Sequence, residues 1–315
     1  MPVTKHFRIY IAGHRGMVGA AVVAALERNG YRNLLVRPHT ELDLTDQAAV
    51  QELLHRLRPE VVILAAARVG GINANNSRPA QFIRDNLLIQ TNVIDAAYRA
   101  GVQKLVFLGS SCIYPRLAPQ PIKEEYLLSG PLEPTNESYA VAKIAGIKMC
   151  QAYRREFGFN AICAMPTNLY GPGDNFNLDD AHVLPALLRR FHEAKMRGDE
   201  HVVVWGSGSP RREFLHVADL ADAIVLLLEV YDEEAIINVG CGTDMTVREL
   251  CETVKAVVGY RGRLEFDTSK PDGTPRKLLD ISKITALGWQ PRISLRSGIE
   301  QLYSWFCENG ASLRL

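Results

Sequence analysis

Apolar runs and amphipathic segments alternate along the first half of the chain. Five short, almost continuously apolar runs predict buried strands, because the strands of a parallel sheet are covered on both faces. They span residues 7–12, 33–36, 61–65, 104–108 and 161–165. Between them, apolar residues recur at helical spacing, which predicts helices over 17–28, 46–57, 79–100 and 139–157. This strand–helix alternation is typical of a doubly wound α/β fold with a parallel sheet.

The alternation loosens after Pro166, where a loop rich in Gly, Asn and Asp spans 172–180. Beyond the loop, the predicted helices are 183–195, 246–258 and 295–308, and the predicted extended segments are 202–205 and 212–216. We interpret this half as a smaller C-terminal α/β lobe interleaved with the last elements of the sheet. The predicted domains are therefore 1–170, completed by parts of 213–240, and 171–315, which would mainly bind the substrate.

Composition and charge exclude several classes of protein. Lys and Arg number 36 against 35 Asp and Glu, a formal charge of +1, so no broad basic surface is expected for nucleic acid or an anionic membrane. The longest apolar runs, 61–67 and 223–228, are too short to span a bilayer, and the N-terminus lacks a signal-peptide pattern. The six cysteines form no C-x-x-C pair and no zinc spacing with histidine. We therefore expect no metal, and free thiols in the cytoplasm.

A glycine-rich turn joins the first predicted strand to the first predicted helix. It reads Gly13-His14-Arg15-Gly16-Met17-Val18-Gly19, with the spacing G-x-x-G-x-x-G. Glycine allows a tight turn, a close approach of the backbone to a pyrophosphate, and close packing of the helix on the strand. The helix that follows offers free N–H groups to phosphate oxygens. A strand, this turn and a helix in succession predict a dinucleotide-binding Rossmann sheet.

Charge after the second predicted strand favours NADP over NAD. NAD sites usually have an acidic residue there for the ribose 2′-hydroxyl, whereas this chain reads Val36-Arg37-Pro38-His39. A guanidinium suits a 2′-phosphate, so we predict NADP (NADPH when reduced), bound by Arg15 and by Arg37 or His39. The alternative is that Arg37 and His39 are solvated loop residues. Asp43 would accept from the adenine amino group or be a surface carboxylate.

Three residues with complementary proton chemistry flank the middle of the predicted sheet. Ser110 follows strand 104–108, and Tyr139 and Lys143 lie four residues apart at the start of a helix. Residues at i and i+4 share a helix face, and an ammonium beside a phenol favours the phenolate. Such a tyrosine can protonate a carbonyl oxygen as hydride reaches the carbon, while a serine hydroxyl holds that oxygen. Tyr-x-x-x-Lys alone would describe an ordinary amphipathic helix, but together with the glycine turn it predicts catalysis.

The motifs together resemble the GDP-L-fucose synthases, a family of extended short-chain dehydrogenases/reductases that act on nucleotide sugars. The resemblance runs nearly from end to end, through segments 13–19, 69–72, 109–115, 133–137, 165–172, 204–208, 212–216 and 269–273. It implies a bifunctional enzyme, which epimerises C3 and C5 of GDP-4-keto-6-deoxy-D-mannose and then reduces C4 with NADPH to give GDP-L-fucose. Ser138 departs from the many relatives that have proline before the tyrosine, and this leaves the chemistry untouched.

The resemblance also implies a role for each matching residue. Tyr139 would protonate the C4 oxygen, Lys143 would lower the pKa of Tyr139 and bind the nicotinamide ribose, and Ser110 would hydrogen-bond the carbonyl. Cys112 and His182 would be the epimerisation pair, with Cys112 as base and His182 as acid. Cofactor contacts are implied for the glycine turn and for Arg37, His39, Asp43, Leu108, Gly109, Ser110, Ser111, Lys143, Pro166, Thr167, Asn168, Leu169 and His182.

Epimerisation next to a ketone is a reaction in which a thiol and an imidazole can serve as base and acid. The C4 carbonyl acidifies C3 and C5, so inversion needs a base on one face and an acid on the other, with pKa values near neutral. A thiol and an imidazole can fill these roles. The alternative from the residues alone is a buried small thiol at Cys112 and a helix-capping histidine at His182.

The second lobe is expected to hold the GDP moiety. Arg190, Trp205, Arg212 and Asp272 match substrate positions of the family: the guanidinium groups suit a diphosphate, the indole would pack on sugar or base, and the carboxylate would accept from ribose or guanine. Each of the four is otherwise a surface charge or a core aromatic. Arg211 and Lys270 are close enough in sequence to replace a named residue.

Two other functions are alternatives to this interpretation, and the resemblance also implies an oligomeric state. One is another nucleotide-sugar enzyme, a 4-epimerase, 4-reductase or 4,6-dehydratase. The pair Cys112 and His182 and the missing acid after strand 33–36 disfavour a 4-epimerase, which usually favours NAD. A non-catalytic NADP-binding sensor would need no tuned phenol. Members of the family are typically homodimers that pair two long helices from each subunit, and 79–100 and 139–157 are the candidates.

Overall fold

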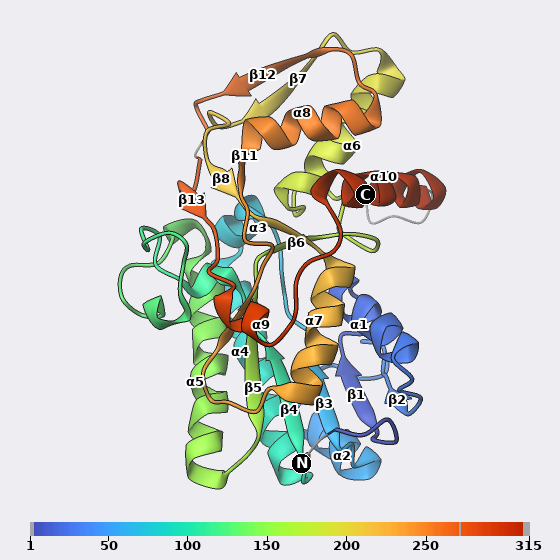
Figure 1. The fold of residues 1–315 in the computed structure, drawn as a ribbon, viewed down its shortest axis with the longest axis vertical. Coiled ribbons are helices and arrows are strands. Elements are labelled where there is room, and N and C mark those ends of the chain that lie inside the picture. Colours follow the sequence, from blue (N-terminus) through green and yellow to red (C-terminus); the bar gives the residue numbers. More distant parts are fainter. Residues whose placement is uncertain (1–2, 271, 311–315) are drawn as a thin grey trace.

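A parallel sheet forms the centre of the larger lobe in the computed structural model, which describes residues 3–270 and 272–310 (Figure 1). Within these residues, six strands pair in parallel in the order β10-β5-β4-β3-β1-β2. They are β1 (Ile9–Ala12), β2 (Leu34–Leu35), β3 (Val61–Leu64), β4 (Lys104–Leu108), β5 (Ala161–Pro166) and β10 (Ile237–Val239). The predicted doubly wound Rossmann sheet is confirmed.

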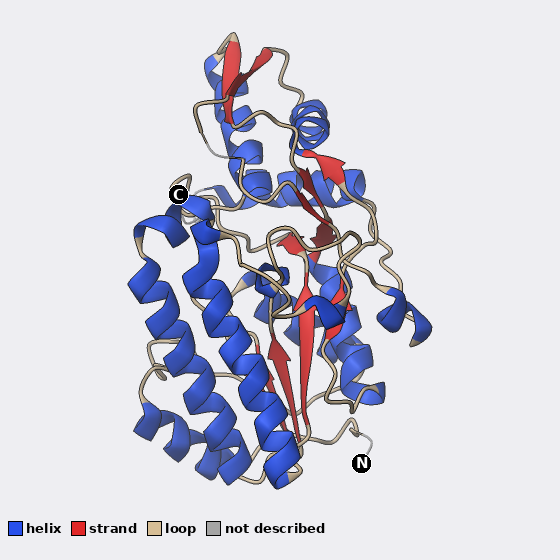
Figure 2. Cartoon of the chain, turned by 90° about the vertical axis from the view of Figure 1, so that its left-hand side faces the viewer, coloured by secondary structure: helices blue, strands red, loops and turns tan. Residues whose placement is uncertain are grey.

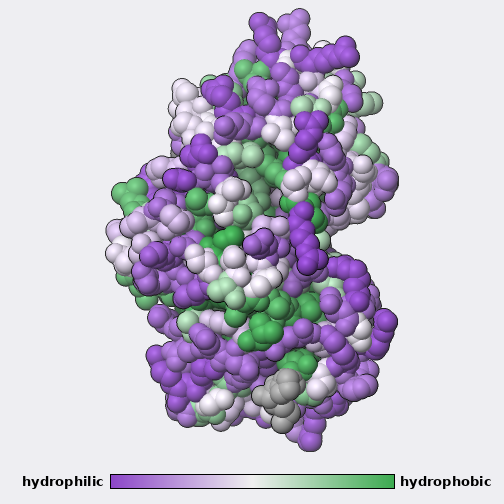
Figure 3. All heavy atoms as spheres, viewed as in Figure 1, coloured by the Kyte–Doolittle hydropathy of each residue, from purple (hydrophilic) through white to green (hydrophobic). Residues whose placement is uncertain are grey.

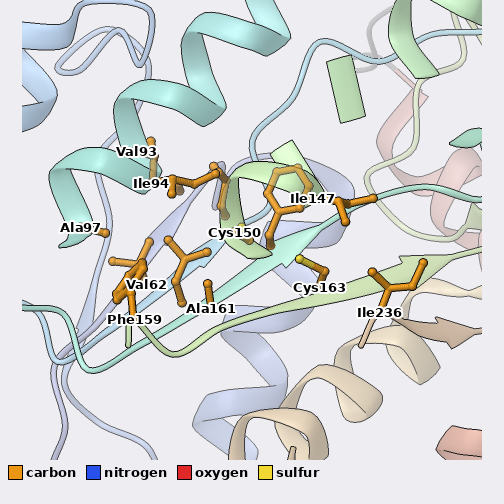
Figure 4. Close-up of a cluster of buried hydrophobic side chains, with 14 of the residues drawn as sticks. Val62, Val93, Ile94, Ala97, Ile147, Cys150, Phe159, Ala161, Cys163 and Ile236 are labelled. Carbon is orange, nitrogen blue, oxygen red and sulfur yellow. The ribbon is translucent and has the colours of Figure 1, made fainter. Parts of the chain in front are cut away.

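Helices cover both faces of this sheet, as the nearly continuous apolar strands require. One face carries α2 (Gln47–Leu57), α4 (Pro79–Arg99) and α5 (Glu137–Phe157), and the other carries α1 (Met17–Arg28) and α7 (Val217–Val230). Successive strand residues point to opposite faces, so Val62 packs in one core and Ile63 in the other. Figure 4 shows the first core, where apolar side chains of α4, α5 and β5 meet.

Several helix boundaries follow from capping residues. Asp46 accepts a hydrogen bond from the Ala49 N–H at 3.1 Å and so begins α2. Thr246 and Glu249 form a capping box at the start of α8 (Val247–Val258). Gly158 ends α5 with φ +67°, a left-handed conformation that glycine adopts without strain. These local signals explain why the predicted helices agree closely with the observed ones.

Two elements beyond residue 170 complete the larger lobe. α7 lies on the sheet, and β10 forms its edge, with Ile237 opposite Ala164 of β5. The apolar run 223–228 lies inside α7. Apolar residues occupy most positions of that segment, so no helical periodicity could be recognised in it. Among the described residues, none of the helices combines the length and apolarity needed to cross a bilayer.

The smaller lobe has a core of its own. There α6 (Val183–Arg197), α8 and α10 (Leu295–Asn309) pack with β7 (His201–Trp205). Its ladders are short: β7 pairs with β12 (Arg263–Asp267), β8 (Arg211–Arg212) with β11 (Met245–Thr246) and β13 (Arg276–Lys277), and β6 (Asn168–Tyr170) with β9 (Phe214–His216). The remaining helical pieces are α3 (Ile72–Ser77), α9 (Ser282–Ala286), η1 (Ser111–Ile113), η2 (Glu124–Tyr126) and η3 (Pro134–Asn136). Figure 3 shows a notch between the upper and lower parts of the molecule.

Candidate active site

The glycine turn between β1 and α1 is closely packed and leads into a helix N-terminus that has no side-chain cap. Gly13 has φ +89°, and a Cβ there would lie 2.8 Å from the backbone of Ala66. A Cβ on Gly19 would lie 2.1 Å from the Gly13 carbonyl oxygen, so only glycine fits at either position. Gly16 caps α1 without a side-chain hydrogen bond. The N–H groups of the first turn can therefore bind phosphate oxygens.

Basic side chains surround this turn, as predicted for a 2′-phosphate. Arg15 and His39 are exposed, and Arg37 is half-buried, with its guanidinium donating to the Val36 carbonyl at 2.6 Å. Sequence reasoning missed Glu41, whose carboxylate lies 3.7 Å from the Arg37 guanidinium. A cofactor phosphate would have to compete with this weak, exposed pair.

Asp43 and His14, two other predicted cofactor residues, differ in whether their side chains already form hydrogen bonds within the protein. The Asp43 carboxylate accepts from the backbone and the hydroxyl of Thr45, at 2.9 and 2.8 Å, and these bonds lower its pKa. One of its two oxygens makes both bonds, so the other can still accept. The Nδ1 atom of His14 is buried and has no partner among the described residues. Burial lowers the pKa of His14, and Arg15 lowers it further.

Ser110, Tyr139 and Lys143 meet at the carboxyl end of β4. Ser110 lies two residues after the end of β4, and its hydroxyl accepts from the Cys112 N–H at 3.2 Å. Lys143 is only 3% exposed, and its ammonium donates to the Leu108 carbonyl at 2.8 Å. Burial lowers the pKa of Lys143 to about 8. The ammonium lies 6.0 Å from the centre of the Tyr139 ring.

The pKa of Tyr139 moves opposite to the expectation from sequence. Burial raises it, Cys112 raises it further, and hydrogen bonding to Ser110 acts in the other direction. Lys143 is directed instead at the Leu108 carbonyl and faces the Phe107 ring at 4.8 Å. The phenol is therefore protonated at neutral pH, which is the form that a proton donor needs.

The Cys112 thiol lies beside this group and has two hydrogen-bond donors of its own. The Asn136 side-chain amide donates to the sulfur at 3.3 Å and the Lys277 ammonium at 3.5 Å. Sequence reasoning missed both donors. Asn136 lies inside the family-like segment 133–137, which was a usable signal, whereas Lys277 reaches the site only because β13 pairs with β8.

His182 lies at the loop–helix junction where it was expected. It is the N-cap residue of α6, but its ring makes no capping hydrogen bond, and the side chain reaches solvent. Surrounding protein atoms and then Lys277 lower the pKa of His182, which favours the neutral ring. The loop before it is fixed by Asp180, whose carbonyl accepts from the Gly71 N–H at 2.8 Å and whose carboxylate pairs with Arg78.

The predicted substrate residues fall into two neighbouring groups. The Arg190 guanidinium lies 5.6 Å from the centre of the Trp205 ring, and both line a cavity of about 360 Å³. Arg212 donates to the Asp272 carbonyl at 3.3 Å, and the Asp272 carboxylate accepts from the N–H and the hydroxyl of Ser207, both at 2.8 Å.

Burial lowers the pKa of both Arg190 and Arg212, so a bound anion would relieve a real desolvation penalty. Lys270 also lies over Trp205, at 5.6 Å from the ring centre. Arg211 instead pairs with Asp244 at 2.9 Å, which occupies the side chain that was considered as a replacement for Arg212.

The segment predicted to line the nicotinamide is tied to the second lobe through Glu213. The Thr167 hydroxyl and the Asn168 amide donate to the Glu213 carbonyl at 3.4 and 2.8 Å. The Glu213 side chain is fully buried and accepts from the N–H groups of Cys241, Gly242 and Leu279, at 2.6, 2.7 and 3.1 Å. Leu108, Ser111 and Thr167 are buried, and Asn168 and Leu169 are half-buried. One buried carboxylate thus joins segments from both lobes.

Comparisons with known proteins agree with this geometry. The NAD dependent epimerase/dehydratase family model matches residues 9–240. GDP-L-fucose synthase 1 of Arabidopsis thaliana is 61% identical over 97% of this chain and 94% of its own length, and GDP-L-fucose synthase of Escherichia coli is 54% identical over 96% and 97%. The structure of a GDP-L-fucose synthetase from Naegleria fowleri bound to NADP has a TM-score of 0.91 at 29% identity, covering 100% of this chain and 98% of that one. The chain belongs to the NAD dependent epimerase/dehydratase family and, within it, to the GDP-L-fucose synthases.

Proposed function

We propose that the protein converts GDP-4-keto-6-deoxy-D-mannose into GDP-L-fucose, by epimerising C3 and C5 and then reducing C4 with NADPH. One observation carries the proposal: the Lys277 ammonium donates to the Cys112 sulfur at 3.5 Å and interacts electrostatically with His182, while Cys112 interacts electrostatically with Tyr139. A plain reductase needs the serine, tyrosine and lysine but has no use for a thiol and an imidazole at the same ketone.

The residues present fit NADPH. The glycine turn packs too closely on the protein's own backbone to accept a Cβ at Gly13 or Gly19, and the first turn of α1 has no side-chain cap, so its N–H groups are free for a pyrophosphate. Arg15, with Arg37 or His39, would hold the 2′-phosphate, and Lys143 would bind the nicotinamide ribose. When bound, NADPH supplies the hydride that reduces the ketone.

The protein's own part in reduction is to hold and protonate the C4 oxygen. Tyr139 carries its proton at neutral pH because burial raises its pKa. The Ser110 hydroxyl would donate to the same oxygen and so orient the carbonyl. As negative charge develops on the oxygen, the phenol proton moves to it, and the ammonium of Lys143, 6.0 Å from the centre of the Tyr139 ring, would attract the phenolate that is left.

Epimerisation would precede reduction, because it needs the C4 carbonyl. Cys112 takes the proton from C3 or C5, so that an S–H bond forms as the C–H bond breaks and the electron pair moves to the C4 oxygen. His182 returns a proton to the opposite face of the carbon. The lowered pKa of His182 makes its protonated ring a stronger acid, although that form is the minor one at neutral pH.

The variant Cys112→Ser tests the assignment in the full chain. With GDP-4-keto-6-deoxy-D-mannose in deuterated water, we expect incorporation of deuterium at C3 and C5 to fall about a hundredfold or more, because a serine hydroxyl is a far weaker base. NADPH oxidation should be impaired less. The matched control is Cys307→Ser, on the exposed side of α10.

Three results would contradict the proposal. Exchange at the wild-type rate in Cys112→Ser would remove Cys112 from the mechanism. Reduction without exchange in the wild type would favour a simple 4-reductase. Bound NADPH that is not consumed on adding the substrate would favour a sensor.

We also propose that the protein is a cytoplasmic homodimer with two domains, 1–170 completed by parts of 213–240, and 171–315, which mainly binds the substrate. The six cysteines, all within the described residues, are free, which suits a reducing compartment. Figure 2 shows α4 and α5 side by side at the edge of the molecule. Exposed apolar residues lie on both helices: Leu88 and Tyr98 on α4, and Val141 and Phe157 on α5. Light scattering should give twice the mass of the chain, and Tyr98→Glu should reduce it to the monomer; a monomeric wild type would contradict the dimer.

A further inference from the structure

We infer that Lys277 is a positioning residue that, together with Asn136, holds Cys112 as the thiolate that removes the substrate proton. The inference rests on the proposed function, in which Cys112 is the base. It adds two residues to which neither sequence reasoning nor the comparisons assign a role.

The contacts of the sulfur are those of a negatively charged acceptor. Lys277 Nζ lies 3.5 Å and Asn136 Nδ2 3.3 Å from Cys112 Sγ. An ammonium has three donors and no acceptor, so it cannot take the proton of an S–H group and favours the ionised sulfur. Within the described part of the chain, Lys277 forms no ion pair with a carboxylate, and its hydrogen bond is the one to Cys112.

Strand pairing brings a second cation to the same place. β13 runs parallel to β8, with Lys277 opposite Arg212 and Arg276 opposite Arg211. Like charges directly opposite each other destabilise a ladder. Arg211 and Arg276 share the carboxylate of Asp244, at 2.9 and 2.5 Å. Lys277 instead donates a hydrogen bond to the Cys112 sulfur, and Arg212 interacts with Cys112 electrostatically. A thiolate at Cys112 would offset the repulsion between these two cations.

The other charged and titratable groups around Cys112 do not reverse this field. Arg212 of β8 and Lys277 of β13 are cationic, Tyr139 of α5 is protonated at neutral pH, and Asn136 and Ser110 are neutral. Glu133 acts on Arg212, but its carboxylate is already bound by Arg116 at 3.2 Å and by the Thr274 hydroxyl at 3.3 Å. Asp272 also acts on Arg212, and among the described residues Lys277 and Arg212 are the two cations whose interaction with the sulfur the structure records.

Lys277 also faces His182 and favours its neutral ring. A single ammonium thus acts on both members of the proposed pair, promoting ionisation of the thiol and proton release by the imidazole. Ionisation of the thiol favours removal of the proton from carbon by Cys112, whereas the lowered pKa of His182 strengthens its protonated ring as an acid and makes that form less populated at neutral pH.

Alkylation of the full-length protein without substrate tests the inference, since iodoacetamide reacts with thiolate and not with thiol. The rate at Cys112 is followed at pH 7 by mass spectrometry, with the exposed Cys307 as internal reference. We expect Lys277→Met to slow alkylation of Cys112 about tenfold, as an ammonium this close to sulfur predicts. Lys277→Arg should keep most of the rate, and Asn136→Ala should lose a smaller part. The control Lys283→Met, at an exposed lysine of α9, should match the wild type.

The activity of Lys277→Met separates a role at the thiol from one in binding substrate. We expect a lower kcat for deuterium incorporation at C3, whereas a residue that only binds the diphosphate would raise KM and leave alkylation unchanged. Wild-type alkylation of Cys112 in Lys277→Met would overturn the inference. Because alkylation needs no substrate, this outcome is distinct from failure of the proposed function, which would appear as absent exchange in the wild type.

Discussion

Replacing Lys143 with methionine is expected to stabilise the free protein while abolishing reduction. The ammonium of Lys143 is 3% exposed, and burial lowers its pKa from 10.5 to about 8. The folded protein therefore holds this proton less tightly than the unfolded chain does. The difference corresponds to about 3 kcal/mol of lost stability at neutral pH. Methionine fills similar space without a charge, but it gives up the hydrogen bond to the Leu108 carbonyl, worth about 1 kcal/mol. A net gain of about 2 kcal/mol remains.

The stability difference between wild type and Lys143→Met should depend on pH, because the folded and unfolded forms lose the Lys143 proton at different pH values. Below pH 8 both the folded and the unfolded forms carry the charge, and the whole penalty is present. Between pH 8 and 10.5 the folded form loses its proton first, so the wild type gains stability relative to the variant as pH rises. Above 10.5 neither form is charged and the penalty is gone.

Urea unfolding of wild type and Lys143→Met at pH 7 and pH 10 measures this directly. We expect the advantage of the variant to shrink by most of the charge term at the higher pH. Lys148→Met, an exposed position on the same helix, is the control and should show no such change. A variant that is no more stable at pH 7, or an advantage of equal size at both pH values, would refute the burial argument for Lys143.

Three further changes have expected outcomes that follow from single contacts. Gly19→Ala should destabilise the free protein by about 2 kcal/mol or more in urea unfolding, because its Cβ would lie 2.1 Å from the Gly13 carbonyl oxygen. The control Gly16→Ala, whose Cβ would lie 3.4 Å from the same oxygen, should have little effect. Equal effects of the two variants would contradict this. Arg37→Ser should weaken NADPH binding about tenfold in a fluorescence titration and leave NADH binding unchanged; an equal loss for both would show that Arg37 does not contact the 2′-phosphate. Glu213→Ala should lose about 3 kcal/mol or more of unfolding free energy, since three buried N–H groups lose their acceptor. Glu213→Gln keeps one acceptor oxygen and should lose less. A loss for Glu213→Gln as large as that for Glu213→Ala would contradict this account.

The elements that sequence predicted well are those with a local cause. The helix over 17–28 was expected with the observed bounds, because a glycine turn precedes it and its apolar residues are periodic. α7 and β12 were missed for opposite reasons. Most positions of α7 are apolar, which hides the helical period. β12 pairs with β7 at the edge of the small lobe, and none of its five residues is fully buried.

The residues of the candidate site also divide into those with a local signal in the sequence and those without one. Ser110, Tyr139 and Cys112 were predictable because each lies in a motif next to a strand end or helix start. Lys277 was not, because nothing in its neighbourhood in sequence marks it and only the pairing of β13 with β8 brings it to the thiol. The direction of the Tyr139 pKa was also beyond sequence, since it depends on burial and on where Lys143 points.

The two proposed activities therefore depend on different parts of the fold. The serine, tyrosine and lysine lie on β4 and α5 of the larger lobe, so reduction can be assembled by the Rossmann sheet alone. The thiol also comes from that lobe, but Lys277 comes from the small ladder that includes Arg212. Glu213 fixes this ladder against the segments at Cys241 and Leu279. Any change that loosens the ladder should remove the cation from Cys112 before it disturbs Tyr139, and epimerisation should fail before reduction does.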